Sequence, residues 1–203
     1  MIQHTFGLLV QPGAQWRRIA QLPESSFRTL LLYPWFLAIL PAFAWYFGTT
    51  HIGWSVADGE PEYLTRQSAR TICILFYLTQ IVCLSVIGYF IHWMSDTYGA
   101  RSSLTKGIVI ASLSATPMFI AGLSGFYPVL WLDMLIGIFS VCWAVYLVYL
   151  GIPIVMDIPE ERGFLFSSAV MGVALVMLIC LMVGAVILWD FGAAPAFTDH
   201  PAS

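Results

Sequence analysis

The stretch that decides the fold lies at residues 112–157, SLSATPMFIAGLSGFYPVLWLDMLIGIFSVCWAVYLVYLGIPIVMD. It contains two long apolar runs joined by a very short turn, GLSGFYP, at residues 122–128. The turn carries no charge, so neither run has the solvent-exposed polar face of an amphipathic helix in a soluble protein. The stretch therefore predicts two membrane-spanning helices in a tight hairpin.

Helix-breaking residues fall inside both runs. Pro117 interrupts the first run, and Gly151 and Pro153 interrupt the end of the second. A proline frees the carbonyl four residues before it, here those of Leu113 and Tyr149. Because lipid offers no hydrogen-bond partner, packed neighbours must bond these carbonyls. The breaks therefore predict a compact protein of several packed helices.

The composition places the whole chain in the membrane. Hydrophobic residues make up 60% of the 203 residues and charged residues 9%, and the mean hydropathy is +0.85. An average soluble domain has about 25% charged residues. The net charge of −3 is too small to favour nucleic acid as a partner. The expected surroundings are therefore the lipid bilayer and other membrane proteins.

Five apolar segments are long enough to cross a bilayer. We expect an all-α membrane protein with five transmembrane helices in a compact bundle and a short interfacial N-terminal helix. The predicted domains are a cytoplasmic or interfacial segment at 1–27, a transmembrane domain at 28–190 and a polar tail at 191–203. The predicted spans are residues 29–47, 71–94, 106–123, 129–156 and 168–189.

The N-terminal segment carries a short amphipathic pattern. Trp16, Ile19 and Ala20 can share one helical face, while Arg17 and Arg18 point elsewhere. This pattern predicts a helix in the headgroup region, with the tryptophan at the boundary and the arginines near anionic lipid. An irregular cytoplasmic tail is the alternative.

Basic residues are distributed unequally between the two sides that five spans define. The side of the N-terminus holds six Lys and Arg residues, and the other side holds two. Because basic residues favour the cytoplasmic side, we expect the N-terminus inside and the C-terminus outside. The six are Arg17, Arg18, Arg28, Arg101, Lys106 and Arg162, and the two are Arg66 and Arg70.

Small residues form a stripe along the third predicted span. Gly107, Ala111 and Ala115 are spaced four residues apart, and Ser112 and Thr116 lie beside them. Small residues allow a second helix backbone to approach closely, and hydroxyls can bond across the contact. The stripe predicts a central, closely packed helix, although small residues are also common in membrane helices without such a role.

Asp133 is the one carboxylate clearly inside a predicted span. Acids within the membrane are functional suspects, but Asp133 lies near the outer end of its span. We expect it to anchor the outer loops by hydrogen bonding and to carry no proton cycle. The candidate partners are Thr49, Thr50, Ser124 and Tyr127.

His92 and Asp96 are four residues apart and share a helix face. A metal site or a proton relay is conceivable, but no third ligand is apparent. The favoured interpretation is that both residues end a helix and meet water, and no metal is expected.

Ser124, in Gly122-Leu-Ser-Gly125, resembles the nucleophile of intramembrane serine proteases, and His51 falls on the same side of the membrane. Nothing in the sequence orients the two residues within hydrogen-bond reach, and a glycine-rich turn explains the pattern. Nucleotide-binding and zinc-protease motifs are missing. We therefore expect no catalytic residue and no cofactor.

The four cysteines fall in apolar runs without a metal-binding spacing, which predicts buried apolar packing without disulfides or zinc. They are Cys73, Cys83, Cys142 and Cys180.

Five short motifs follow one another along nearly the whole chain. They are P-x3-W-x2-I at 12–19, GTTHIGW at 48–54, ATP-x-FIAGL at 115–123, YPVLWL at 127–132 and YLVYLGIP at 146–153. In order and spacing they resemble the Yip family (Ypt-interacting proteins), in particular its small bacterial inner-membrane, YohC-like members. The resemblance implies a five-helix membrane bundle with a cytoplasmic N-terminus and supplies no catalytic residues. Eukaryotic relatives bind small GTPases through a long N-terminal region, which is short here, so GTPase binding is not expected.

The favoured function is that of a non-enzymatic integral protein of the bacterial inner membrane. It would act by self-association or by interaction with lipid or other membrane proteins, in membrane organisation or a trafficking-like role. The alternative is a small-solute or ion permeation protein, with the span broken at Pro117 as its pore element.

Overall fold

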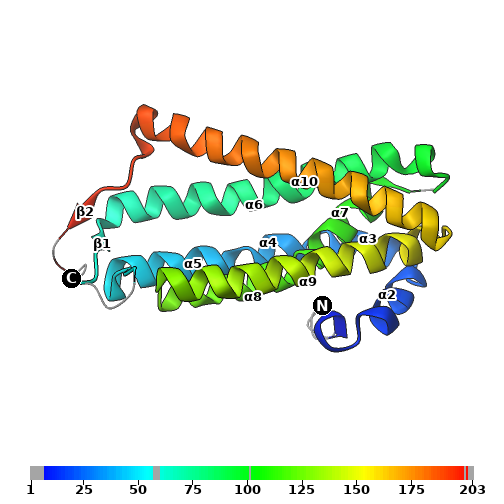
Figure 1. Cartoon of the computed structure of the whole chain (residues 1–203), viewed down its shortest axis with the longest axis horizontal. Coiled ribbons are helices and arrows are strands. Elements are labelled where there is room, and N and C mark those ends of the chain that lie inside the picture. Colours follow the sequence, from blue (N-terminus) through cyan, green and yellow to red (C-terminus); the bar gives the residue numbers. More distant parts are fainter. Residues whose placement is uncertain (1–6, 57–59, 101, 199, 201–203) are drawn as a thin grey trace.

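The computed structural model describes residues 7–56, 60–100, 102–198 and 200. Long helices run alongside one another in a bundle, and two short strands lie at one end of it (Figure 1). Within this described part, four helical segments are long and apolar enough to cross a membrane, and a bent helix pair makes a fifth if it counts as one span. The all-α membrane architecture agrees with the sequence prediction.

Prolines divide the first span into short helices. Pro34 stands in the first turn of its helix, where a missing N–H is tolerated, and both Pro34 and Pro41 are buried. The pieces form one apolar segment, Glu24–Ile52, which contains the predicted span 29–47 and extends beyond it at both ends. They are α3 (Glu24–Leu30), α4 (Tyr33–Leu37), α5 (Ile39–Phe47) and the π-helix η1 (Gly48–Ile52).

The second span is the single helix α6 (Arg66–Ser95). The Thr65 side chain caps its first turn by accepting a hydrogen bond from the backbone N–H of Ser68. A 3-10 turn, η2 (Asp96–Tyr98), follows α6. Gly99, with φ of 73°, then ends the helical path.

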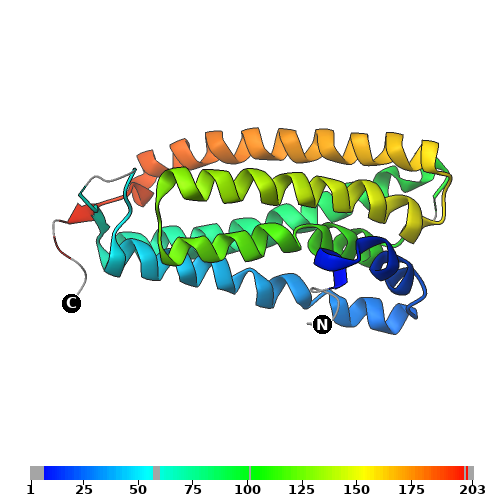
Figure 2. The same ribbon diagram turned by 60° about the horizontal axis from the view of Figure 1, so that its bottom comes forward.

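The third predicted span is broken close to the expected proline. It consists of α7 (Leu104–Ser114), α8 (Thr116–Ala121) and the 3-10 helix η3 (Gly122–Phe126), and it bends by 42°. Its start lies beside the start of the first span, where Ser103 donates a hydrogen bond to Glu24. Its end packs on the end of the first span, where Gly125 contacts Gly48. The two broken spans therefore run side by side in the same direction (Figure 2).

The fourth span, α9 (Leu130–Met156), continues through Gly151 and Pro153. The predicted break at these residues is therefore wrong. A Cβ atom on Gly163 would lie 2.5 Å from the Pro153 Cβ, so the next helix approaches closely over the proline ring. The helix ends at Asp157, a non-glycine residue with φ of 51°.

The fifth span, α10 (Glu160–Leu188), begins eight residues before the predicted start at residue 168. A π-helix, η4 (Trp189–Ala193), follows it. The strands β1 (Tyr63–Leu64) and β2 (Phe197–Thr198) then pair antiparallel, with Tyr63 opposite Thr198. This pairing, absent from the sequence prediction, joins the loop before α6 to the tail after α10. We call this end of the bundle the sheet end.

The N-terminal helix α2 (Pro12–Ala20) packs at the opposite end of the bundle, which we call the α2 end (Figure 1). Arg17 and Arg18 are exposed as expected, but Trp16 is 0% exposed. A Cβ atom on Gly151 would lie 2.6 Å from Cε2 of Trp16. The indole therefore sits against α9, and the expectation of a tryptophan at the lipid boundary is wrong.

All four cysteines are free, but Cys142 and Cys180 are exposed on α9 and α10. The prediction of buried packing is wrong for these two, because an apolar side chain on a membrane helix can face lipid instead of protein. Cys73 and Cys83 are half-buried.

Candidate functional site

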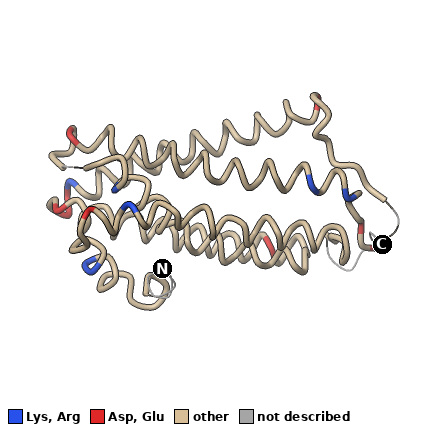
Figure 3. The backbone as a smooth tube through the Cα atoms, turned by 180° about the vertical axis from the view of Figure 1, so that it is seen from behind, with Lys and Arg blue, Asp and Glu red and all other residues tan. Residues whose placement is uncertain are grey.

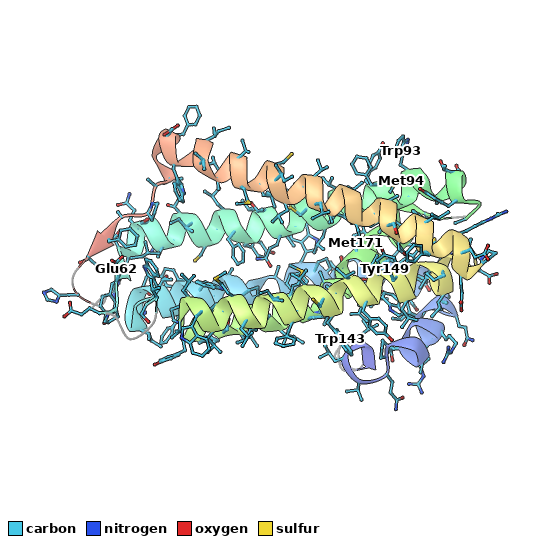
Figure 4. All side chains as sticks on the ribbon, in the orientation of Figure 1. Glu62, Trp93, Met94, Trp143, Tyr149 and Met171 are labelled. Atoms are coloured by element: carbon cyan, nitrogen blue, oxygen red, sulfur yellow. The ribbon has the colours of Figure 1, made fainter. Side chains whose placement is uncertain are left out.

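A groove of about 730 Å³ lies between α8–η3 on one side and α9 on the other. Its walls are apolar except for Ser124 and Ser140. Figure 4 shows Trp143, one of its walls, on the side of α9 that faces the N-terminal segment. The lining residues are Leu9, Pro117, Ile120, Ala121, Leu123, Ser124, Ile136, Phe139, Ser140 and Trp143.

The break at Pro117 lies beside this groove. Pro117 starts α8 and lines the groove, and the 42° bend turns α8 away from the line of α7. α9 carries no comparable break over residues 130–156, and it packs against α7, α8 and η3 in turn. The Ser140 hydroxyl donates to the Ile136 carbonyl of its own helix at 2.7 Å, which leaves the groove with little polar chemistry to offer a ligand.

The hydroxyl of Thr116 compensates the proline break. It donates a hydrogen bond to the Leu113 carbonyl at 2.6 Å, the carbonyl that Pro117 frees. The Tyr33 hydroxyl lies 2.8 Å from Thr116 Oγ1. Thr116 is therefore the new hydrogen-bond partner that the Leu113 carbonyl was expected to need. Tyr33, from the first span, contacts the same hydroxyl.

Gly107 of the predicted stripe packs against α6. A Cβ atom on Gly107 would overlap the Gly88 carbonyl, so the backbones of α6 and α7 are in contact there. Ala111 is buried and Ala115 half-buried. The Ser112 hydroxyl donates to the Ile108 carbonyl at 2.7 Å, so it bonds within its own helix and not across the contact.

The anchoring predicted for Asp133 stays a prediction, because Ser124, one of its four candidate partners, interacts with the carboxyl group. Both carboxylate oxygens are shielded from solvent and accept no hydrogen bond from any residue that the structure describes. Thr49 and Thr50 donate instead to backbone carbonyls of their own helical segment. Ser124 lies near the carboxyl group without a hydrogen bond of ordinary geometry to it.

His92 and Asp96 are not joined by a hydrogen bond in the described chain. Nδ1 of His92 is buried without a partner, whereas Asp96 is exposed in η2. Residues 7–56, 60–100, 102–198 and 200 hold no group of three or more His, Cys, Asp and Glu side chains that could bind a metal ion.

Ser124 and His51 do not form a hydrogen-bonded pair in the described residues. Nδ1 of His51 lies 2.8 Å from the Thr50 hydroxyl, and its ring stacks on Phe47 with 4.7 Å between centroids. Ser124 stands in η3 and lines the groove. No hydrogen bond between the serine and the histidine occurs in the part of the chain that is described, so a nucleophile–base pair is not assembled.

Three contacts that position the helices are missing from the sequence prediction. They are Gly88 against Gly107, Gly151 against Trp16, and Tyr33 against Thr116. A glycine inside a long apolar segment permits a close approach, but Gly137 and Gly184 meet no atom within 4 Å, so glycine alone does not single out Gly88 and Gly151 as contact sites.

Comparison with known proteins identifies the family. The Yip1 domain family matches residues 6–183. The chain is 33% identical over 191 residues to "Inner membrane protein YohC" of Escherichia coli strain K12, covering 94% of this chain and 98% of that protein. It has the same identity and coverage with the protein of that name from Escherichia coli O6:H1 strain CFT073. No solved structure matches the chain. With a family match over most of its length and apolar helices long enough to cross a membrane, the chain belongs to the Yip1 domain family of multi-pass membrane proteins.

Proposed function

We propose that this protein is a non-enzymatic protein of the bacterial inner membrane that works by docking another apolar transmembrane segment. The segment belongs to a second copy of the chain or to another membrane protein, and the role is one of membrane organisation or trafficking. The inner-membrane location follows the names of the two relatives.

The observation that carries this proposal is the groove between α8–η3 and α9. Its volume of about 730 Å³ falls within the range of roughly 300–1,000 Å³ typical of binding pockets. Eight of its ten lining residues are apolar, and a membrane setting makes an apolar helix or side chain the natural occupant. The groove residues include no acid, base or thiol.

Photo-crosslinking in native membranes tests this proposal. A photoreactive amino acid replaces Phe139, which lines the groove and is 70% exposed. The matched control replaces Val82, which is also exposed but lies on α6. We expect protein adducts from position 139 and lipid adducts alone from position 82. Equal patterns from the two positions would overturn the groove as the docking surface.

We also propose that α7 and α8 count as one span, giving five spans with the N-terminus inside. In support, the charged residues gather at the two ends of the bundle (Figure 3), and basic residues favour the cytoplasmic side. The described cations of the α2 end outnumber those of the sheet end. They are Arg17, Arg18, Arg28, Lys106 and Arg162 against Arg66 and Arg70.

Permeation of a small ion is the second candidate function, and Asp133 favours it. A carboxylate whose oxygens are shielded from solvent inside an apolar helix is the kind of group that proton-coupled membrane proteins use. Proton flux into liposomes that contain the protein tests this function.

A further inference from the structure

We propose that the space between the sheet-end halves of α6 and α10 binds a phospholipid with an anionic phosphate headgroup. Its acyl chain would lie between the two helices, and its phosphate would lie beside Arg66 and Arg70. This site is separate from the groove, so the inference does not rest on the proposed function.

The apolar part of this site is a pair of unpacked helix halves. α10 buries Gly163, Phe166, Ser167 and Val170, all near its start. No residue from 171 to 188 is buried, and no residue of α6 from 70 to 80 is buried. Figures 1 and 2 both show the two helices close together towards the α2 end and apart at the sheet end.

A glycine shows that this space is open. Gly184 lies on the side of α10 that continues its buried face, spaced 7 residues from the half-buried Met177 and 14 residues from Val170. A Cβ atom on Gly184 would meet no atom within 4 Å. At Gly184, α10 therefore has a position turned towards its own bundle that no residue of the described chain covers, and an acyl chain is an occupant of suitable chemistry.

The polar part of the site is a pocket of about 190 Å³ where α6 begins. Gln67, Ser68 and Thr71 form one wall, and the chain that returns from η4 forms the other. Ser68 ties the walls together, because its hydroxyl accepts a hydrogen bond from the Ala196 N–H at 3.0 Å. The polar pocket and the apolar space thus adjoin, as the headgroup and tail of a lipid do.

Charge complementarity selects an anionic headgroup. Arg66 and Arg70 precede Gln67 and Thr71 directly in α6, and both are exposed. They lie four residues apart on one helix face, where like charges repel. Neither makes an ion pair or hydrogen bond with another described residue. A phosphate diester between them would remove this repulsion.

The test uses the full-length protein in nanodiscs of phosphatidylcholine with a phosphatidylglycerol that carries a photoreactive acyl chain. We expect adducts in residues 70–80 and 171–188. Each arginine near a membrane surface contributes about 1 kcal/mol with anionic lipid, so unlabelled phosphatidylglycerol should compete roughly 30-fold better than phosphatidylcholine. Equal competition by the two lipids would overturn the proposal, and competition by inorganic phosphate alone would show a phosphate site without a lipid.

Three variants separate charge from folding. The double variant Arg66→Gln, Arg70→Gln should lose the preference for phosphatidylglycerol, whereas Arg66→Lys, Arg70→Lys should keep it. The control Arg17→Gln, Arg18→Gln at the α2 end should leave the adducts in α6 and α10 unchanged. Loss of the preference in both Arg66/Arg70 variants would overturn the charge argument.

A disulfide formed between Cys180 of two copies in native membranes would show that a second copy covers this part of α10, and it would overturn the lipid assignment. If position 139 captures a protein but the lipid competition shows no preference for phosphatidylglycerol, this inference fails and the proposed function stands. If the competition shows that preference but position 139 captures no protein, the proposed function fails and this inference stands.

Discussion

The Tyr33 hydroxyl lies 2.8 Å from the Thr116 hydroxyl, across 83 residues of sequence. Each residue directly precedes a proline, Pro34 or Pro117, at a break in its span. Because the Thr116 proton is directed to the Leu113 carbonyl, Tyr33 donates and Thr116 accepts. One buried pair of hydroxyls therefore joins the breaks of two parallel spans.

Removing this pair should destabilise the bundle. Tyr33→Phe should lower the free energy of unfolding by about 0.5–1.5 kcal/mol, the usual contribution of one hydrogen bond. Thr116→Val should have a larger effect, because it also leaves the buried Leu113 carbonyl without its partner. Unfolding in a denaturing-detergent titration measures both. Tyr127→Phe is the control, since Tyr127 is exposed and should show no effect.

The contact between Gly88 and Gly107 should tolerate no added methyl group. Gly107→Ala would push against the Gly88 backbone and should destabilise the protein by about 1–3 kcal/mol. Gly184→Ala, in the open face of α10, should be neutral or stabilise by up to about 1 kcal/mol through helix propensity. Thermal unfolding in detergent compares the two. Equal stability of both variants would contradict the close contact.

Gly151→Ala should release α2 from the bundle. The added Cβ would lie 2.6 Å from the Trp16 ring, so the indole must leave its place against α9. Cleavage by trypsin after Arg17 and Arg18 should then become faster. Gly137→Ala in the same helix meets no atom within 4 Å and serves as the control, and unchanged cleavage of the Gly151 variant would argue against the packing of Trp16.

Asp133→Leu should keep or raise stability, because neither carboxylate oxygen has a hydrogen bond of ordinary geometry to lose and the desolvation penalty of the carboxylate disappears. Asp133→Asn keeps the shape of the side chain. If liposomes show a pH-driven flux that Asp133→Asn abolishes, permeation replaces docking as the function. A large loss of stability in Asp133→Leu would show that the carboxylate does have partners.

The proposed orientation predicts where reporters become active. A reporter fused after Ser203 should be active outside the inner membrane, and one inserted between Asp96 and Ser103 should be active inside. The physical reason is the excess of basic residues on the side of the N-terminus. Signals in the reverse positions would mean that the bundle is inserted the other way round.

Spans are readable from this sequence because a bilayer demands long apolar segments with few charges. The same reasoning finds the break near Pro117, since a proline disturbs its helix wherever the helix packs. Pro153 shows the limit of this rule. There α9 continues with Gly163 of α10 packed closely against the ring, and a contact between two helices leaves no mark in either local pattern.

Candidate site residues were harder to predict than spans. The groove lies where α8 and η3 pack beside α9, and that contact depends on tertiary packing. Trp16 looked suited to the lipid boundary, and only its partner Gly151 shows where the indole lies. Asp133 had four plausible donors in sequence, but two of them, Thr49 and Thr50, are held by their own helix carbonyls.

The pairing of β1 with β2 has a consequence for biogenesis. Phe197 and Thr198 are made after every span, and a membrane protein is inserted as its chain emerges from the N-terminal end. Tyr63 and Leu64 therefore have no partners until α10 has been made. Closure of the sheet end follows the synthesis of α10, and it distinguishes a chain that has reached Thr198 from one that stalled after α10.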